Sequence, residues 1–102
     1  MYNLEVSDRA EQDLDNIISY IKDKLFAPKA AVDFADAVYD CYDHLEENPY
    51  IYSLCNDPNL QKEDYRRAII NNYILVFKIY EETKKVIAHR FFYGGQNYVD
   101  LI

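Results

Sequence analysis

Basic and aromatic side chains gather towards the C-terminal end of the sequence, and their chemistry suits RNA. The group comprises Arg66, Arg67, Lys78, His89, Arg90, Tyr93 and Tyr98. Aromatic rings stack on unpaired bases, arginine neutralises phosphate, and histidine or tyrosine can move protons during attack by a ribose 2′-hydroxyl. Such cleavage requires a base, an acid and a cation beside the phosphorane, and it requires no metal. The group predicts a metal-independent RNA-cleaving site whose catalytic residues are Arg66, Arg67, His89, Arg90 and Tyr98.

The same residue types also have a structural explanation, which chemistry alone favours. Arg66 or Arg67 would pair with a helix carboxylate, His89 would be a hydrogen-bonded sheet residue, and Tyr93 would contribute only packing. At this point both explanations stay open.

The sequence lacks the motifs of several other kinds of binding site. Gly94 and Gly95 are the only glycines, which excludes a dinucleotide-binding loop and a phosphate-binding P-loop. Cys41 and His44 have zinc-ligand spacing but no partner pair, so neither a metal nor another cofactor is expected. Cys41 and Cys55 are interpreted as small buried packing residues that stay reduced.

The elements that must position the group begin with a short strand and two helices. Leu4 and Val6 fit a strand, and a helix follows in which Asp8 is the expected N-cap and Glu11 reaches back. A second helix begins at Pro28 and ends at residues 48–49. The apolar stripes of the two helices are Ala10, Leu14, Ile17, Ile18, Ile21 and Leu25, then Ala31, Phe34, Ala35, Val38, Tyr42 and Leu45. Their spacing predicts an antiparallel helical hairpin joined at residues 26–27.

The second half of the chain predicts three strands. Residues 50–64 lack periodicity and are expected to form a long exposed loop, while 65–70, 73–80 and 86–93 are rich in β-branched and aromatic residues. The predicted fold is α+β with the order β-α-α-β-β-β: a single domain, residues 1–102, with an antiparallel curved sheet packed on the N-terminal helical hairpin and its other face open. Alternation does not decide which face of the last strand carries His89 or Arg90, because each set of alternate residues contains one of them.

Charge is divided unevenly along the 102 residues. The net charge is −7, but residues 1–64 hold 15 acidic and 5 basic side chains, whereas residues 65–102 hold 3 acidic and 6 basic ones. The acidic total argues against nucleic-acid binding, and the basic second half softens that argument. The N-terminus lacks the features of a signal peptide and no apolar stretch suits a membrane, so a cytoplasmic protein without membrane contact is expected.

Three segments and their order carry a family resemblance. They are YNLEVSDRAEQDLDNIISYI, PKAAVDFADAVYDCYDHLEENP and YRRAIINNYILVFKIYEETKKVIAHRFFYGGQNYVDLI. Together they resemble the RelE/ParE superfamily of type II toxin–antitoxin toxins, also known as plasmid stabilisation proteins, over nearly the whole chain. The resemblance implies a cytoplasmic bacterial toxin that is neutralised by an antitoxin encoded beside it, whose disordered segment wraps the toxin in a hetero-oligomer.

The resemblance leaves the target open. RelE-like members cut mRNA in the ribosomal A site, whereas ParE-like members inhibit DNA gyrase without a chemical step. Ile69 stands where RelE-type enzymes carry a phosphate-contacting arginine, and residues 95–97 replace the arginines that relatives commonly place after the glycine. The first departure, with the basic pair earlier at Arg66 and Arg67, matches the ParE type better. The second leaves His89, Arg90 and Tyr98 as candidates, and both departures argue against nuclease activity. The alternatives are therefore an mRNA endoribonuclease, a gyrase inhibitor, or a degenerate non-toxic protein that binds antitoxin.

Overall fold

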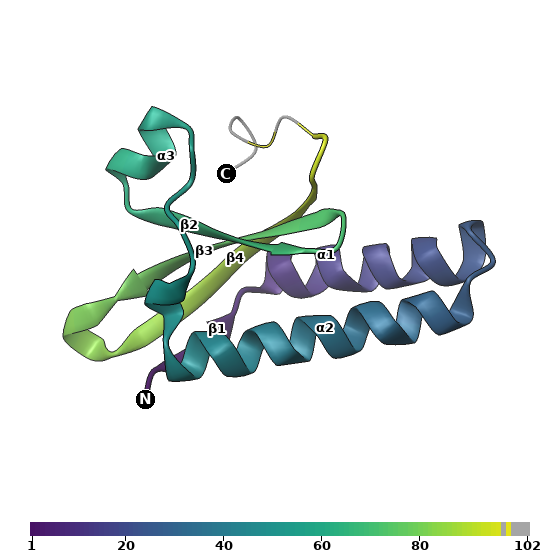
Figure 1. Ribbon diagram of the computed structural model, residues 1–102, viewed down its shortest axis with the longest axis horizontal. Helices are drawn as coiled ribbons and strands as arrows, with labels where there is room; N and C mark the ends of the chain where they lie inside the picture. Colours follow the sequence, from purple (N-terminus) through teal and green to yellow (C-terminus); the bar gives the residue numbers. More distant parts are fainter. Residues whose placement is uncertain (97, 99–102) are drawn as a thin grey trace.

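The computed structural model describes residues 1–96 and Tyr98, and within them the predicted order of elements is confirmed (Figure 1). Asn97, noted above in the tail, lies outside the described residues. The elements are β1 (Asn3–Val6), α1 (Asp8–Ser19), the π-helical turn η1 (Tyr20–Lys24), α2 (Pro28–Glu47), the 3-10 turn η2 (Pro49–Ile51), α3 (Pro58–Lys62), β2 (Tyr65–Ile70), β3 (Tyr73–Tyr80), the 3-10 turn η3 (Glu81–Thr83) and β4 (Lys85–Tyr93).

The four strands form one open sheet in the order β1-β4-β3-β2. β3 pairs antiparallel with β2 and β4, as predicted, whereas β1 pairs with β4 in parallel. Parallel pairing requires a long crossover connection, which the two helices and the following strands supply. Figure 1 shows both long helices side by side against one face of the sheet, which confirms the predicted α+β arrangement.

The main core lies between the helical hairpin and the sheet. α2 contributes Phe34, Val38 and Leu45, and the sheet contributes Leu75 and Phe77, all of them almost completely buried. The expected N-cap at Asp8 is wrong: Ser7 caps α1, and its side chain accepts a hydrogen bond from the Ala10 N–H. Ser7 has extended backbone angles, which place its hydroxyl over the first turn.

The connection between the helices departs from a regular helix end. The Leu25 N–H donates to the Tyr20 carbonyl, and the Ala27 N–H donates to the Ile21 carbonyl, each over 3.2 Å. These wider turns rotate the chain, so Leu25 does not continue the predicted stripe and is 54% exposed. Phe26 follows with a left-handed backbone, φ 49°.

The sheet face opposite the hairpin is partly covered, which differs from the expected open face. Residues 52–64 do not form a featureless loop, because they contain α3 and an isolated bridge between Leu54 and Arg66. Cys55 and Leu60 from this segment are buried with Ile74, Val76 and Phe92 in a second small core. Both cysteines are buried and free, as interpreted from the sequence.

A β-bulge explains why alternation failed for β4. Val76 pairs with Arg90 and Phe77 pairs with Ala88, so His89 is an extra residue without its own partner in β3. The bulge reverses the alternation, so that Val86, Ala88 and then Phe91 belong to the main core while Phe92 belongs to the second core. Among the described residues, no helix is both long and apolar enough to cross a membrane.

Candidate functional site

Arg66 lies on the helix-facing side of β2, in the same row as the core residues Ala68 and Ile70. Its Nη1 donates a hydrogen bond of 2.7 Å to the carbonyl of Tyr52, and its guanidinium lies 5.0 Å from the ring centroid of Tyr50. Arg66 therefore fixes the segment after α2 to the sheet. The predicted pairing of this arginine with a helix carboxylate is not what the structure has, since its partner is a backbone carbonyl.

Arg67 lies on the opposite face of β2, because successive strand residues point to opposite sides. Its backbone N–H donates to the Ser53 carbonyl over 3.0 Å, while its Nε atom is buried without a hydrogen-bond partner. The side chain lines two neighbouring open hollows of about 300 and 330 Å³, which meet at the exposed side chain of Ile69. The positive charge of Arg67 therefore lies beside two solvent-accessible hollows.

His89 lies in the β4 bulge and contacts aromatic and basic neighbours. Its ring packs edge-on against Tyr65 with centroids 5.4 Å apart, and its Nε2 is buried without a hydrogen-bond partner. Lys78 lies over the Tyr65 and Tyr80 rings, at 5.3 and 5.7 Å from their centroids. Burial, and then the positive charge of Lys78, lower the pKa of His89 below its ordinary value of 6.5. The imidazole is therefore neutral at pH 7, and the predicted hydrogen-bonded sheet histidine is wrong for its Nε2 atom.

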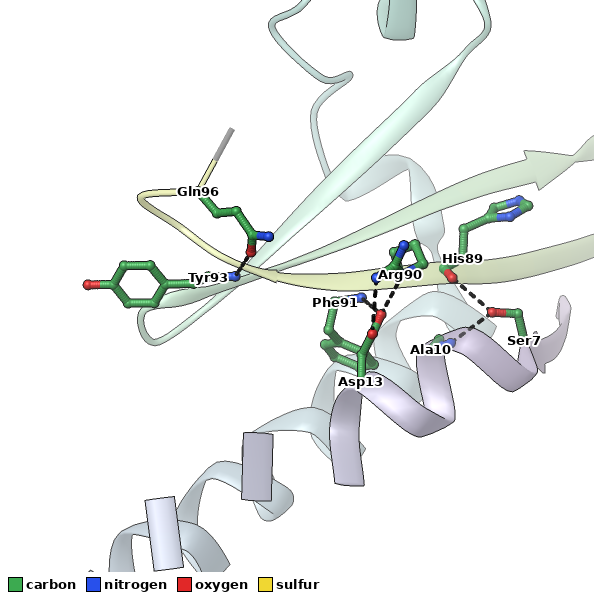
Figure 2. Close-up of polar contacts among 8 residues, drawn as sticks. All are labelled: Ser7, Ala10, Asp13, His89, Arg90, Phe91, Tyr93 and Gln96. Atoms are coloured by element: carbon green, nitrogen blue, oxygen red, sulfur yellow. Dashed lines mark hydrogen bonds and ion pairs between the residues drawn. The ribbon is translucent and has the colours of Figure 1, made fainter. Parts of the chain in front are cut away.

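Arg90 reaches the helix side of the molecule and pairs with Asp13 of α1 (Figure 2). Its Nε and Nη2 atoms donate to the Asp13 carboxylate over 2.7 and 3.2 Å, and the Phe91 N–H donates to the same carboxylate over 3.0 Å. The guanidinium also lies 4.8 Å from the ring centroid of Phe92. Nearby, the Ser7 hydroxyl donates to the His89 carbonyl over 2.8 Å. The side chains of Asp13 and of Ser7, the N-cap of α1, thus take the place of a strand partner where β1 has ended.

Tyr98 folds back onto the second core. Its ring stacks on Phe92, with centroids 5.3 Å apart and ring planes 19° apart. Burial raises the pKa of Tyr98, which the positive charge of Arg67 partly opposes. At neutral pH the phenol is therefore protonated and can act only as a hydrogen-bond donor or acceptor.

The five predicted residues do not converge on one point. Arg67, His89 and Tyr98 lie on the sheet face opposite the hairpin, whereas Arg66 makes its contacts on the helix side. Arg90 contacts both Asp13 of α1 and Phe92 of the second core. Sequence reasoning left out Tyr65, which contacts both Lys78 and His89, although its position opposite Lys78 follows from the predicted hairpin. It also left out Asp13, whose proximity to β4 has no local signal in the sequence.

One protein-family model matches nearly the whole chain. The sequence model described as "ParE toxin of type II toxin-antitoxin system, parDE" matches residues 4–98. No curated protein matches the sequence.

Solved structures share the fold at low sequence identity. The chromosomal ParDE toxin–antitoxin system from P. aeruginosa gives a TM-score of 0.72 at 16% identity, over 91% of this chain and 96% of that one. The RelBE2 toxin–antitoxin complex from Mycobacterium tuberculosis gives 0.63 at 17% identity, over 90% and 96%. The intact E. coli RelBE toxin–antitoxin complex gives 0.58 at 16% identity, over 94% and 100%.

Proposed function

We propose that this chain, which belongs to the ParE toxin family of type II toxin–antitoxin systems, arrests growth by binding DNA gyrase and catalyses no reaction of its own. The dispersion of its basic residues supports the proposal. Metal-free RNA cleavage needs a base, an acid and a cation around one phosphate. Here Arg66 holds a backbone carbonyl on the helix side of the sheet, and the Arg90 guanidinium is held by the Asp13 carboxylate of α1.

The net charge of −7 supports the same choice. A protein that enters the ribosomal A site must approach a dense array of phosphates, which repels an acidic molecule. Association with a protein target carries no such requirement.

We also propose that a cognate antitoxin neutralises the chain in a hetero-oligomer. The similar solved structures are toxin–antitoxin complexes or systems. An acidic toxin favours an antitoxin segment rich in lysine and arginine.

The direct test adds the purified chain to purified gyrase and relaxed plasmid. We expect supercoiling to stop and gyrase–DNA cleavage complexes to accumulate. Unchanged supercoiling without trapped complexes, at toxin concentrations well above that of gyrase, would contradict the proposal. In cells, induction should give DNA-damage signalling and filamentous growth before protein synthesis falls.

A second candidate function is mRNA cleavage on the translating ribosome, and one observation favours it. Arg67, His89 and Tyr65 lie on the same sheet face, where a neutral imidazole could accept a proton. Discrete cuts in the message, weakened by His89→Ala and unaffected by Asp15→Ala on the exposed side of α1, would select this candidate. Normal growth during induction would instead indicate a non-toxic protein that binds antitoxin.

A further inference from the structure

The end of the helical hairpin exposes an unusual run of large apolar side chains. We define the hairpin tip as residues 20–29, which lie at the far end of the two long helices, beyond the edge of the sheet, in Figure 1. Within it Phe26 is 87% exposed, Leu25 is 54% exposed and Tyr20 is 50% exposed. Single exposed apolar residues are ordinary on protein surfaces, but three large ones within seven residues are unusual.

The backbone of the hairpin tip has two unusual features. Its π-helical turn spans Tyr20–Lys24, and π-helical turns are frequent at functional sites. Phe26 adopts the left-handed conformation, φ 49°, which glycine or asparagine adopts at lower energy. A phenylalanine here is strained, and its ring contributes little to the core. The left-handed conformation ends the helix, and a contact outside the chain accounts for the choice of phenylalanine at this position.

A hollow opens beside these residues. Its volume is about 360 Å³, and it lies between the tip, the turn joining β2 to β3, and the end of β4. Its lining is largely aromatic and aliphatic, with Leu25, Phe34, Tyr73 and Tyr93 among the lining side chains. A hollow of this size and character suits an apolar side chain of a partner.

The charge at the tip is opposite in sign to that of the whole molecule. Lys22, Lys24 and Lys29 outweigh Asp23, whereas the chain carries a net charge of −7. Lys29 pairs with Asp33 over 3.1 Å, and no ion pair among residues 1–96 and 98 involves Lys22 or Lys24. Two exposed ammonium groups therefore flank the apolar patch.

We propose that the hairpin tip is the surface by which this toxin binds its target protein. Phe26 enters an apolar pocket on the target that is ringed by carboxylates complementary to Lys22 and Lys24. In return, an apolar side chain of the target enters the hollow beside Leu25. This inference rests on the proposed function, because the target it addresses is gyrase.

The test compares Phe26→Ala with the unchanged chain in binding to purified gyrase and in the supercoiling assay. Anchoring aromatic residues dominate protein interfaces, so we expect binding to weaken at least about tenfold. Tyr39→Ala is the matched control, because Tyr39 is also an exposed aromatic residue, 62% exposed, in the middle of α2. The control should bind gyrase as the unchanged chain does. Lys22→Glu combined with Lys24→Glu should weaken binding more at low salt than at high salt.

Two further measurements separate the outcomes. Phe26→Gly removes the ring and relieves the left-handed strain, so it tests the ring in a variant that should remain folded even if Phe26→Ala does not. If the unchanged chain does not bind gyrase, the proposed function falls together with this inference. If the unchanged chain binds and both Phe26 variants bind equally well, only the assignment of the tip is overturned. The assignment would also be overturned if the Phe26 variants bound gyrase normally but no longer bound the purified antitoxin encoded by the neighbouring gene. The tip would then belong to the antitoxin interface.

Discussion

Replacement of Asp13 should destabilise the protein more than replacement of any exposed carboxylate on α1. The Asp13 side chain is 15% exposed and that of Arg90 is 18% exposed. If one partner is removed, water therefore has little access to hydrogen-bond with the other. In Asp13→Ala the Phe91 N–H and the Arg90 guanidinium both lose this acceptor. Removing one partner of such a charged network costs about 2–4 kcal/mol of unfolding free energy. For a domain of this size the loss lowers the melting temperature by roughly 10–20 °C.

The assay is urea unfolding followed by circular dichroism, with Asp13→Asn and Asp15→Ala beside Asp13→Ala. Asp13→Asn should cost about 1–2 kcal/mol, because its carbonyl can still accept from Phe91 while the charge is lost. Asp15→Ala should stay within about 0.5 kcal/mol of the unchanged chain, since Asp15 is exposed.

A double-mutant cycle with Arg90→Ala isolates the pair. We expect a coupling energy of about 2 kcal/mol, because Asp13 and Arg90 are in direct contact. Additivity of the two replacements, or an unfolding midpoint of Asp13→Ala equal to that of Asp15→Ala, would refute the structural role of this pair.

Three further predictions concern the backbone and the titrating groups. Phe26→Gly should be more stable than Phe26→Ala by about 1 kcal/mol in chemical denaturation, because only glycine relieves the left-handed strain; the reverse order would mean that this conformation is not held. Hydrogen bonds from Lys84 and from two tyrosine hydroxyls lower the pKa of Glu81 from its ordinary 4.5 to about 2, so its contribution to stability is present above pH 4.5 and disappears as the pH falls towards 2. As the pH falls from 4.5 towards 2, the unfolding free energy of Glu81→Gln should therefore decrease less than that of the unchanged chain. Parallel decreases in the two proteins would contradict this. The pKa of His89, followed by NMR, should lie below 6.5 and rise in Lys78→Met, while a pKa above 6.5 would be inconsistent with the buried ring.

Much of the fold could be predicted because strong local patterns mark it. The helical stripes, Pro28 at the start of α2 and the residues 71–72 at the β2–β3 turn identify their elements directly, and Asn71 indeed adopts φ 54°. The short helix α3 was missed because the residues Asp57 and Pro58 that cap and begin it also suit a turn. A segment of five residues is too short for hydrophobic periodicity to distinguish a helix from a turn.

The candidate site could be predicted only in part. Arg66 and Arg67 are adjacent in a strand, so alternation alone places them on opposite faces and prevents both from contacting one phosphate. The bulge at His89 could not be predicted, because one inserted residue leaves the apolar pattern equally consistent with either face. The contact between Asp13 and Arg90 joins positions 77 residues apart, and only the three-dimensional structure brings them together.

The parallel pairing of β1 with β4 has a consequence for synthesis on the ribosome. The sheet joins Asn3–Val6 to Lys85–Tyr93, so its first strand lacks its partner until nearly the whole chain has been translated. The helical hairpin emerges much earlier, with its apolar stripe still uncovered. At about 5–20 residues per second, translation from the end of α2 to the end of β4 takes roughly 2–9 seconds. During that interval a nascent toxin presents the apolar side of its hairpin to any partner in reach, before its sheet can form.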